Sequence, residues 1–400
     1  MRLNYFYNKI IRSYKSGTLT NRVIQFIWIR IRTYFLVLKE YYGLSESYRN
    51  LNLVDGFKDH RNKKYHHQSN QEHIQRIINA YKESKKHQLS ASKAFAVEGL
   101  WDEWIDVNYQ YLINALETEN ISKLSSIFEN LFRESCTIGT GGYDNWIRYQ
   151  SLFGKLYLKS VWSNYEKKLL SLPIGKNDLI FPNVGNPAGV LKNGNIISIE
   201  TLRHAYHAVS IKQLFQNRKD LICVEIGGGL GGQGYQTMNI CNNNISRYLL
   251  FDIPEVATLS SYMMLSAFPN KKIRLFGEGP ISVSDNNYDI GIFPHYSISE
   301  LRELSVDLFY NSCSFSEMDE KSSTEYLSVI NKCCRKYFMH DNHDKTFIFK
   351  NNDGTESKNI IGSDLVPDKS KFKRIYKKPR VHGLPEDKSY IHHEFLYERI

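Results

Sequence analysis

The segment that most constrains the fold is residues 224–232, which reads VEIGGGLGG and holds five glycines in nine residues. An apolar run typical of a buried strand leads into it, and a helix is expected to follow it to about Cys241. Glycine lets the chain turn sharply and lets a ligand lie against bare backbone. The N-terminus of the following helix adds a site that favours negative charge. This pattern predicts a strand–turn–helix unit that binds a nucleotide-like ligand.

Strands and helices alternate beyond this turn. A proline at position 254 suits the first turn of a helix that ends near Phe268. The spacing Ser322-x-x-Glu325 predicts a capping box at the start of another helix. Alternation of this kind predicts an α/β fold with a doubly wound, Rossmann-like sheet. The expected strands are 221–226, 247–252, 288–293, 306–310 and 336–340, with an antiparallel pair from the tail 372–400.

The chain divides into two parts that differ in residue composition and in hydrophobic pattern. Residues 1–170 are rich in Tyr and Trp and predict a mainly helical N-terminal region, with a polar, histidine-rich loop at 59–73. Residues 171–400 predict the ligand-binding domain. For the N-terminal region we expect a role in substrate binding, in homo-oligomer formation or in membrane contact.

Composition excludes several classes of protein. The chain is 42% apolar, which is ample for a packed core and rules out wholesale disorder. It contains no uncharged apolar run of the roughly 18 residues that a spanning helix needs. Six cysteines without a C-x-x-C pair indicate reduced thiols in a cytoplasmic protein rather than a disulfide framework or a zinc ribbon. No signal peptide is recognisable at the N-terminus.

Positive charge is concentrated at the N-terminus. Of the net charge of +10, residues 1–42 contribute +7, from eight Lys/Arg against the single acid Glu40. The rest of the chain is close to neutral, so nucleic acid is not an expected partner. Residues 23–38 also carry apolar side chains at helical spacing. Two interpretations stay open: peripheral contact with the inner face of a membrane, or a helix packed on the protein or on a second subunit.

Two ligand classes fit the glycine-rich turn. Gly227-x-Gly229-x-x-Gly232 satisfies the dinucleotide pattern, which would suit an oxidoreductase. Gly227-x-Gly229-x-Gly231 with Glu225 upstream satisfies the S-adenosylmethionine pattern. A carboxylate would repel a pyrophosphate but attract the ammonium and sulfonium groups of S-adenosylmethionine, so we favour methyl transfer.

A group of segments resembles the bacterial sugar O-methyltransferases, a branch of the class I S-adenosylmethionine-dependent methyltransferases. The resemblance covers roughly residues 180–400, and the segments that carry it are 185–187 (GNP), 224–232, 249–255 (LLFDIPE), 311–318 (NSCSFSEM) and 397–399 (YER). It implies S-adenosylmethionine as cofactor, a sugar or glycan acceptor, nucleotide- or lipid-linked or polymeric, and a role in surface or secreted glycan synthesis. A non-catalytic scaffold of a glycan assembly complex is the other alternative. The cofactor residues that we expect are Glu225, Gly227, Gly229, Gly231, Asp252 and Ile253.

Catalytic candidates come from the predicted carboxyl ends of the strands, where ligands bind in doubly wound sheets. A sugar hydroxyl is a weak nucleophile and needs a base within hydrogen-bond reach. His343 is the first candidate because it is expected to lie just past a strand, His340 is the second and Glu317 the third. Residues 341–344 are too local to supply a full ligand set for a metal, so no metal is assigned.

Overall fold

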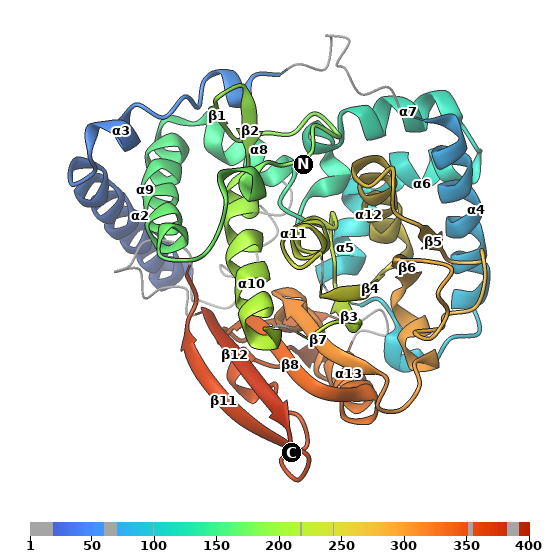
Figure 1. Ribbon diagram of the computed structural model, residues 1–400. Helices are drawn as coiled ribbons and strands as arrows, with labels where there is room; N and C mark the ends of the chain where they lie inside the picture. The colour runs from blue at the N-terminus through green and yellow to red at the C-terminus, as the bar shows by residue number, and fades with distance from the viewer. Residues whose placement is uncertain are drawn as a thin grey trace.

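The computed structural model describes residues 19–59, 70–98, 100–216, 218–242, 244–350, 355–381 and 392–400. Its centre is an eight-stranded sheet in the order β11-β12-β8-β7-β3-β4-β6-β5 (Figure 1). The last two strands of the chain run antiparallel to their neighbours, and the other neighbouring strands are parallel. The strands are β3 (Leu221–Ile226), β4 (Ile245–Asp252), β5 (Ile273–Leu275), β6 (Ile290–Pro294), β7 (Val306–Ser312), β8 (Cys334–His343), β11 (Phe372–Pro379) and β12 (His392–Arg399).

The predicted α/β class and the antiparallel tail are therefore confirmed. β3 is paired with β4 on one side and with β7 on the other, so the direction of winding changes at β3. Ligands of doubly wound sheets bind at the carboxyl ends of the strands beside such a point. The helices of this half are α10 (Ile199–Phe215), α11 (Gly232–Ile240), α12 (Pro254–Ala267) and α13 (Glu320–Cys333).

Both faces of the central strands β3, β4, β6 and β7 are buried, and successive residues along a strand contribute to different cores. On β4, Tyr248 and Leu250 join the larger core with α10, α11 and α12. Leu249 and Phe251 join a second core on the other face, which contains Ile330 of α13. The near-continuous apolar character of the central strands follows from this two-sided burial.

The N-terminal region is helical, as predicted, and it packs into the larger core rather than standing apart. α4 lies along α12, and Phe128 stacks on Tyr262 of α12 with ring centroids 4.7 Å apart. The division into 1–170 and 171–400 stays a prediction. The N-terminal helices are α2 (Leu19–Tyr42), α3 (Glu46–Arg49), α4 (Gln71–Gln88), α5 (Leu100–Asn108), α6 (Gln110–Glu117), α7 (Ile121–Glu129), α8 (Tyr143–Gln150) and α9 (Leu152–Leu170).

Two local predictions need correction. α13 begins at Glu320, and its N-cap is Asp319, which accepts from the Ser322 N–H, so the expected capping box at Ser322 is wrong. β8 runs on to His343 because β12 supplies an antiparallel partner, in which His392 pairs with His343. His343 therefore lies within a strand and not past it.

Pro254 does begin α12, as expected. Most of the predicted loop 59–73 lies outside the described residues. Two small hairpins complete the fold, β1 (Val190–Lys192) with β2 (Asn195–Ile197) and β9 (Ile348–Lys350) with β10 (Glu356–Lys358). No helix within the described ranges has both the length and the apolar character to cross a bilayer.

Candidate functional site

The glycine-rich turn between β3 and α11 depends on left-handed backbone. Gly227 has φ +72° and Gly229 has φ +55°, a region that side-chain-bearing residues rarely adopt. A Cβ on Gly227 would lie 2.2 Å from Ser314 Oγ, so the absent side chain also allows the turn to approach the end of β7. A Cβ on Gly229 would meet nothing closer than Thr140, at 3.6 Å. The turn therefore presents bare backbone toward a space bordered by Thr140.

Asp252, at the end of β4, braces this turn. Its Oδ2 accepts a hydrogen bond from the Gly229 N–H at 2.8 Å, and its Oδ1 accepts one from the Ile253 N–H at 2.8 Å. Burial raises the pKa of Asp252 to about 7, although these two hydrogen bonds lower it. Because each carboxyl oxygen has a second lone pair, Asp252 can still accept hydrogen bonds from a ligand.

A pocket extends from this turn, and residues of the N-terminal region cover it, among them Phe95 and Trp101, which we call the pocket roof. The lining of the pocket comes from strand ends, from the start of α13, from the start of α5 and the segment before it, and from the segment before α8. The lining residues are Phe95, Ala96, Val97, Glu98, Trp101, Gly139, Thr140, Gly227, Gly229, Asp252, Ile253, His295, Ser312, Cys313, Ser314, Glu317, Met318, Asp319, Ser322 and Tyr326.

Glu317 enters the pocket from the segment after β7. Its Oε2 accepts a hydrogen bond from Trp101 Nε1–H at 3.2 Å, which ties the N-terminal region to the sheet. Burial raises the pKa of Glu317 to about 7, while the Trp101 hydrogen bond lowers it. A carboxyl with this pKa can take up or release a proton near neutral pH.

His295 enters the pocket just past the end of β6. Its Nε2 lies 2.7 Å from the Phe95 carbonyl oxygen, which can only accept, so Nε2 carries a proton. Burial lowers the pKa of His295 to about 4, so the ring is neutral at pH 7. Nδ1 is then an unprotonated acceptor, buried and without a partner among the described residues. His295 therefore adds to the pocket lining a buried ring nitrogen that accepts no hydrogen bond from the described residues.

The pocket lining is acidic. It contains the carboxyl groups of Glu98, Asp252, Glu317 and Asp319 and no Lys or Arg side chain among its described residues. Such a lining favours a ligand with positive charge or with many hydroxyl donors, and it disfavours phosphate groups.

The expected cofactor residues divide into two groups. Gly227, Gly229, Asp252 and Ile253 line the pocket, whereas Glu225 and Gly231 do not. The Glu225 side chain lies away from the lining because it accepts a hydrogen bond from Tyr248 Oη–H at 2.8 Å. Burial raises the pKa of Glu225 to about 8. Glu225 was expected to contact the cofactor directly, but its side chain does not line the pocket.

The catalytic candidates divide in the same way, because Glu317 lines the pocket and the two histidines do not. His340 is buried in β8 and stacks on Phe395 of β12, with ring centroids 4.5 Å apart. Burial lowers the pKa of His340 to about 3 and that of His343 to about 4. The expectation that His343 reaches the site from beyond the strand fails, because β8 extends as far as His343 and pairs it with His392 of β12.

Among the described residues, no group of three or more His, Cys, Asp or Glu side chains is arranged to hold a metal ion. The carboxyl groups of 341–344 have other partners. Asp341 forms an ion pair with Arg380, with Oδ2 2.9 Å from Nε, and Asp344 accepts from Ser363 at 2.7 Å.

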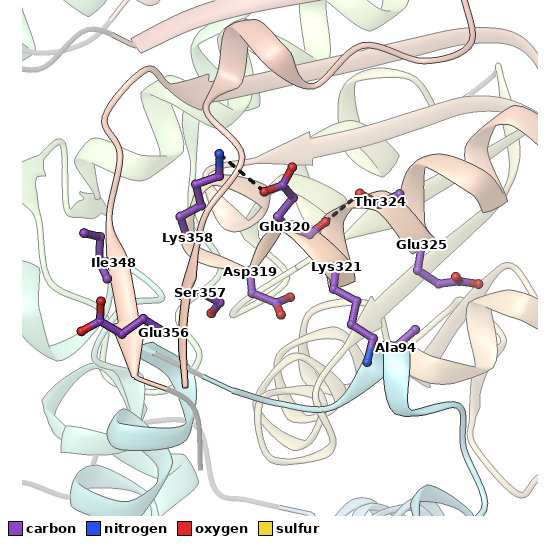
Figure 2. Close-up of a pocket in the computed structure, with 10 residues that line it drawn as sticks. All are labelled: Ala94, Asp319, Glu320, Lys321, Thr324, Glu325, Ile348, Glu356, Ser357 and Lys358. Carbon is purple, nitrogen blue, oxygen red and sulfur yellow. Dashed lines mark hydrogen bonds and ion pairs between the residues drawn. The ribbon is translucent and has the colours of Figure 1, made fainter. Parts of the chain in front are cut away.

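A second, more open hollow adjoins the pocket (Figure 2). It lies between the β9–β10 hairpin and the first turns of α13, where Glu320 and Lys358 form an ion pair of 3.7 Å. Asp319 lines both spaces. The hollow carries none of the glycine-turn residues, so we place the chemistry in the pocket.

Sequence reasoning missed His295 and, of the residues that line the pocket from the N-terminal region, Phe95 and Thr140. The signal for His295 was its place directly after the strand end Pro294, the same signal that pointed to Asp252. No sequence signal pointed to Phe95 or Thr140 as pocket residues, because only packing of the N-terminal region onto the sheet brings them there.

No protein-family model matches the chain, and no curated protein matches it. Among solved structures, it is similar to an S-adenosylmethionine-dependent methyltransferase from Mesorhizobium loti, with 12% identity over 48% of this chain and 96% of that one and a TM-score of 0.30. It is also similar to magnesium protoporphyrin IX methyltransferase from Synechocystis PCC 6803 with bound S-adenosylhomocysteine, with 10% identity over 62% and 97% and a TM-score of 0.33. At these values the likeness identifies no family, and function has to follow from the site residues.

Proposed function

We propose that this chain is an S-adenosylmethionine-dependent O-methyltransferase that acts on a sugar hydroxyl. The observation that carries the proposal is the pocket in which a glycine-rich turn and Asp252 share one acidic lining with Glu317 and His295. The turn supplies a ligand cradle, Glu317 a proton acceptor and His295 a fixed hydrogen-bond acceptor.

S-adenosylmethionine suits this lining better than a dinucleotide does. Its ammonium and sulfonium groups are positive, and it has no phosphate. A dinucleotide would bring a pyrophosphate beside Asp252 and Glu317 with no Lys or Arg in the described lining to neutralise it. Asp252 is placed to accept hydrogen bonds from ribose hydroxyls, and the bare backbone at Gly229 leaves room for the ligand.

The bound cofactor would supply an electrophilic methyl group. Within the pocket, we assign Glu317 as the base that takes the proton of the acceptor hydroxyl as the oxygen bonds to carbon. Trp101 holds Oε2 of that carboxylate, so Oε1 remains for the hydroxyl. We assign His295 Nδ1 as the acceptor of a hydrogen bond from a second hydroxyl of the substrate, which would fix the orientation of the substrate. The roof formed by Phe95 and Trp101 limits the access of water.

A sugar acceptor agrees with the aromatic and acidic character of the pocket. Trp101 and Tyr326 contribute aromatic side chains to the lining, which suit an apolar sugar surface, and the carboxyl groups can accept hydrogen bonds from hydroxyl donors. The sequence resemblance points to the same substrate class and to glycan synthesis in the cytoplasm. An acidic lining favours an acceptor whose sugar enters without its phosphate groups.

Calorimetry with S-adenosylmethionine, S-adenosylhomocysteine and NADH tests the cofactor assignment. We expect the first two to bind and NADH not to bind, and Asp252→Ala to weaken binding by about 1–3 kcal/mol through lost hydrogen bonds to a charged group. Transfer of a labelled methyl group to a panel of neutral and phosphorylated sugars then tests the acceptor class. Binding of NADH alone would favour the oxidoreductase, and cofactor binding without transfer to any acceptor would favour the scaffold.

A further inference from the structure

The outer face of α2 exposes a stripe of large apolar side chains. Trp28, Phe35 and Tyr42 are 67%, 69% and 73% exposed, and Ile31 and Leu38 are also exposed. These residues follow one another at intervals of three and four, so they share one face of the helix. A helix on the surface of a globular protein normally turns polar residues to solvent, and an exposed apolar stripe marks an interaction surface.

The stripe is not required for packing within the chain. The other side of α2 packs against α9 and contains the fully buried Val37. Between the two sides, the partly exposed Tyr34 packs on Phe153 with ring centroids 4.0 Å apart. α2 is the outermost helix on this side of the molecule (Figure 1). The chain therefore presents the stripe outward from a helix that is already anchored.

The positive charge near the stripe indicates which kind of surface docks on it. Exposed Arg32 lies beside the stripe, and residues 1–42 carry eight basic residues against one acid. A second copy docked through the same face would place the exposed Arg32 of both copies at one interface, where like charges repel. An anionic surface would attract them.

We infer that the exposed face of α2 docks on an anionic phospholipid surface. The helix would lie in the plane of the interface, with Trp28 and Phe35 among the upper acyl chains and Arg32 among the headgroups. Each basic residue near an anionic leaflet strengthens partitioning by about fivefold. This inference is independent of the proposed enzymatic activity.

Co-sedimentation of the full chain with vesicles of phosphatidylcholine and phosphatidylserine tests the inference, with pure phosphatidylcholine vesicles alongside. We expect binding to the anionic vesicles that weakens at high salt. Arg32→Gln should weaken it by about fivefold. Trp28→Ser with Phe35→Ser should weaken it by more than about tenfold, because burial of each aromatic side chain is lost.

Matched controls come from α4, on the opposite side of the molecule (Figure 1). Lys86→Gln on this helix and Leu89→Ser at its C-cap also replace exposed side chains, one basic and one apolar, and should leave binding unchanged. Equal binding to neutral vesicles, no binding at all, or equal losses in the α4 variants would overturn the inference. So would a dimer, measured by analytical ultracentrifugation, that Trp28→Ser with Phe35→Ser dissociates while vesicle binding is absent.

Discussion

At the scale of single residues, the pocket is defined by how burial changes the proton affinity of its groups. The same loss of water raises the pKa of Glu317 to about 7 and lowers the pKa of His295 to about 4. At neutral pH the carboxyl is therefore poised to exchange a proton, while the imidazole stays neutral and only accepts a hydrogen bond. The two groups can therefore bind the same substrate in different roles, Glu317 as the base and His295 as a hydrogen-bond acceptor.

Glu317→Gln should lower turnover by about 10²–10⁴-fold, because a positioned base contributes that much. In the unsubstituted protein turnover should rise with pH through about 7, as Glu317 ionises. Trp101→Phe removes a hydrogen bond that favours the carboxylate, so its pH profile should shift to higher pH. Steady-state rates between pH 5 and 9 check both. If Glu317→Gln retains full turnover while His343→Ala loses it, the base is His343.

Gly229→Ala should weaken cofactor binding with a modest loss of stability. The new methyl group would project toward Thr140 in the pocket, and its left-handed backbone costs about 1 kcal/mol. Gly194→Ala is the matched control, since Gly194 has φ +78° but a Cβ there would meet nothing within 4 Å. Calorimetry and thermal unfolding of both variants check this. Equal affinity in the two variants would place the cofactor elsewhere.

At the scale of elements, the β8–β12 pair contributes to the second core and places His340 among its aromatic residues. His340 lies in a stack with Phe395 and Tyr397 of β12, whose rings are nearly parallel to its own. The neutral ring packs like an aromatic residue there. This arrangement makes the fold sensitive to acid, because the unfolded chain can protonate His340 and the folded chain resists it.

The pH dependence of stability follows from the difference between the folded and unfolded pKa values of His340. The folded pKa of His340, about 3, lies below its unfolded value near 6.5, so stability is lost as pH falls below about 6.5. Between pH 7 and pH 5 the free energy of unfolding should fall by about 2 kcal/mol less in His340→Phe than in the unsubstituted protein. Urea unfolding at the two pH values measures it. Phe338→Leu, which alters the same stack without a titrating group, should keep the full loss; an unchanged loss in His340→Phe would contradict the assignment.

At the scale of the whole molecule, the helical region and the sheet share one core and one pocket. Arg76 of α4 forms an ion pair with Glu278, with Nε 2.7 Å from Oε1, and Tyr296 donates to the Ser84 carbonyl oxygen at 2.7 Å. The Phe128–Tyr262 stack joins α7 to α12. We therefore expect the two parts to unfold together.

Phe128→Ala should destabilise the whole chain by about 3–5 kcal/mol, as expected for removal of a buried aromatic side chain. Far-ultraviolet and near-ultraviolet circular dichroism should report one coincident thermal transition in both proteins, at a lower temperature in the variant. Two separate transitions, with only the first one shifted by Phe128→Ala, would instead support independent domains at 1–170 and 171–400.

The sequence by itself determined the sheet and one wall of the pocket. The apolar run before the glycines, Asp252 and the segment with Glu317 are local patterns, because a strand end, a turn and a polar loop depend on neighbouring residues. For the same reason the α/β class could be predicted from residues 221–317. The extent of β8 could not, since it depends on pairing with β12, which lies about 50 residues further along the chain.

Only the tertiary structure decided which groups meet. Trp101 and Glu317 are 216 positions apart, and His295 and Phe95 are 200 apart, yet each pair forms a hydrogen bond in the pocket. Contacts at such separations leave no period or motif in the sequence, because they depend on how the helical region packs against the sheet. Burial then sets the proton affinity of these groups, and burial is a property of the folded chain as a whole. The same packing decides that one face of α2 is covered by α9 and the other is left exposed.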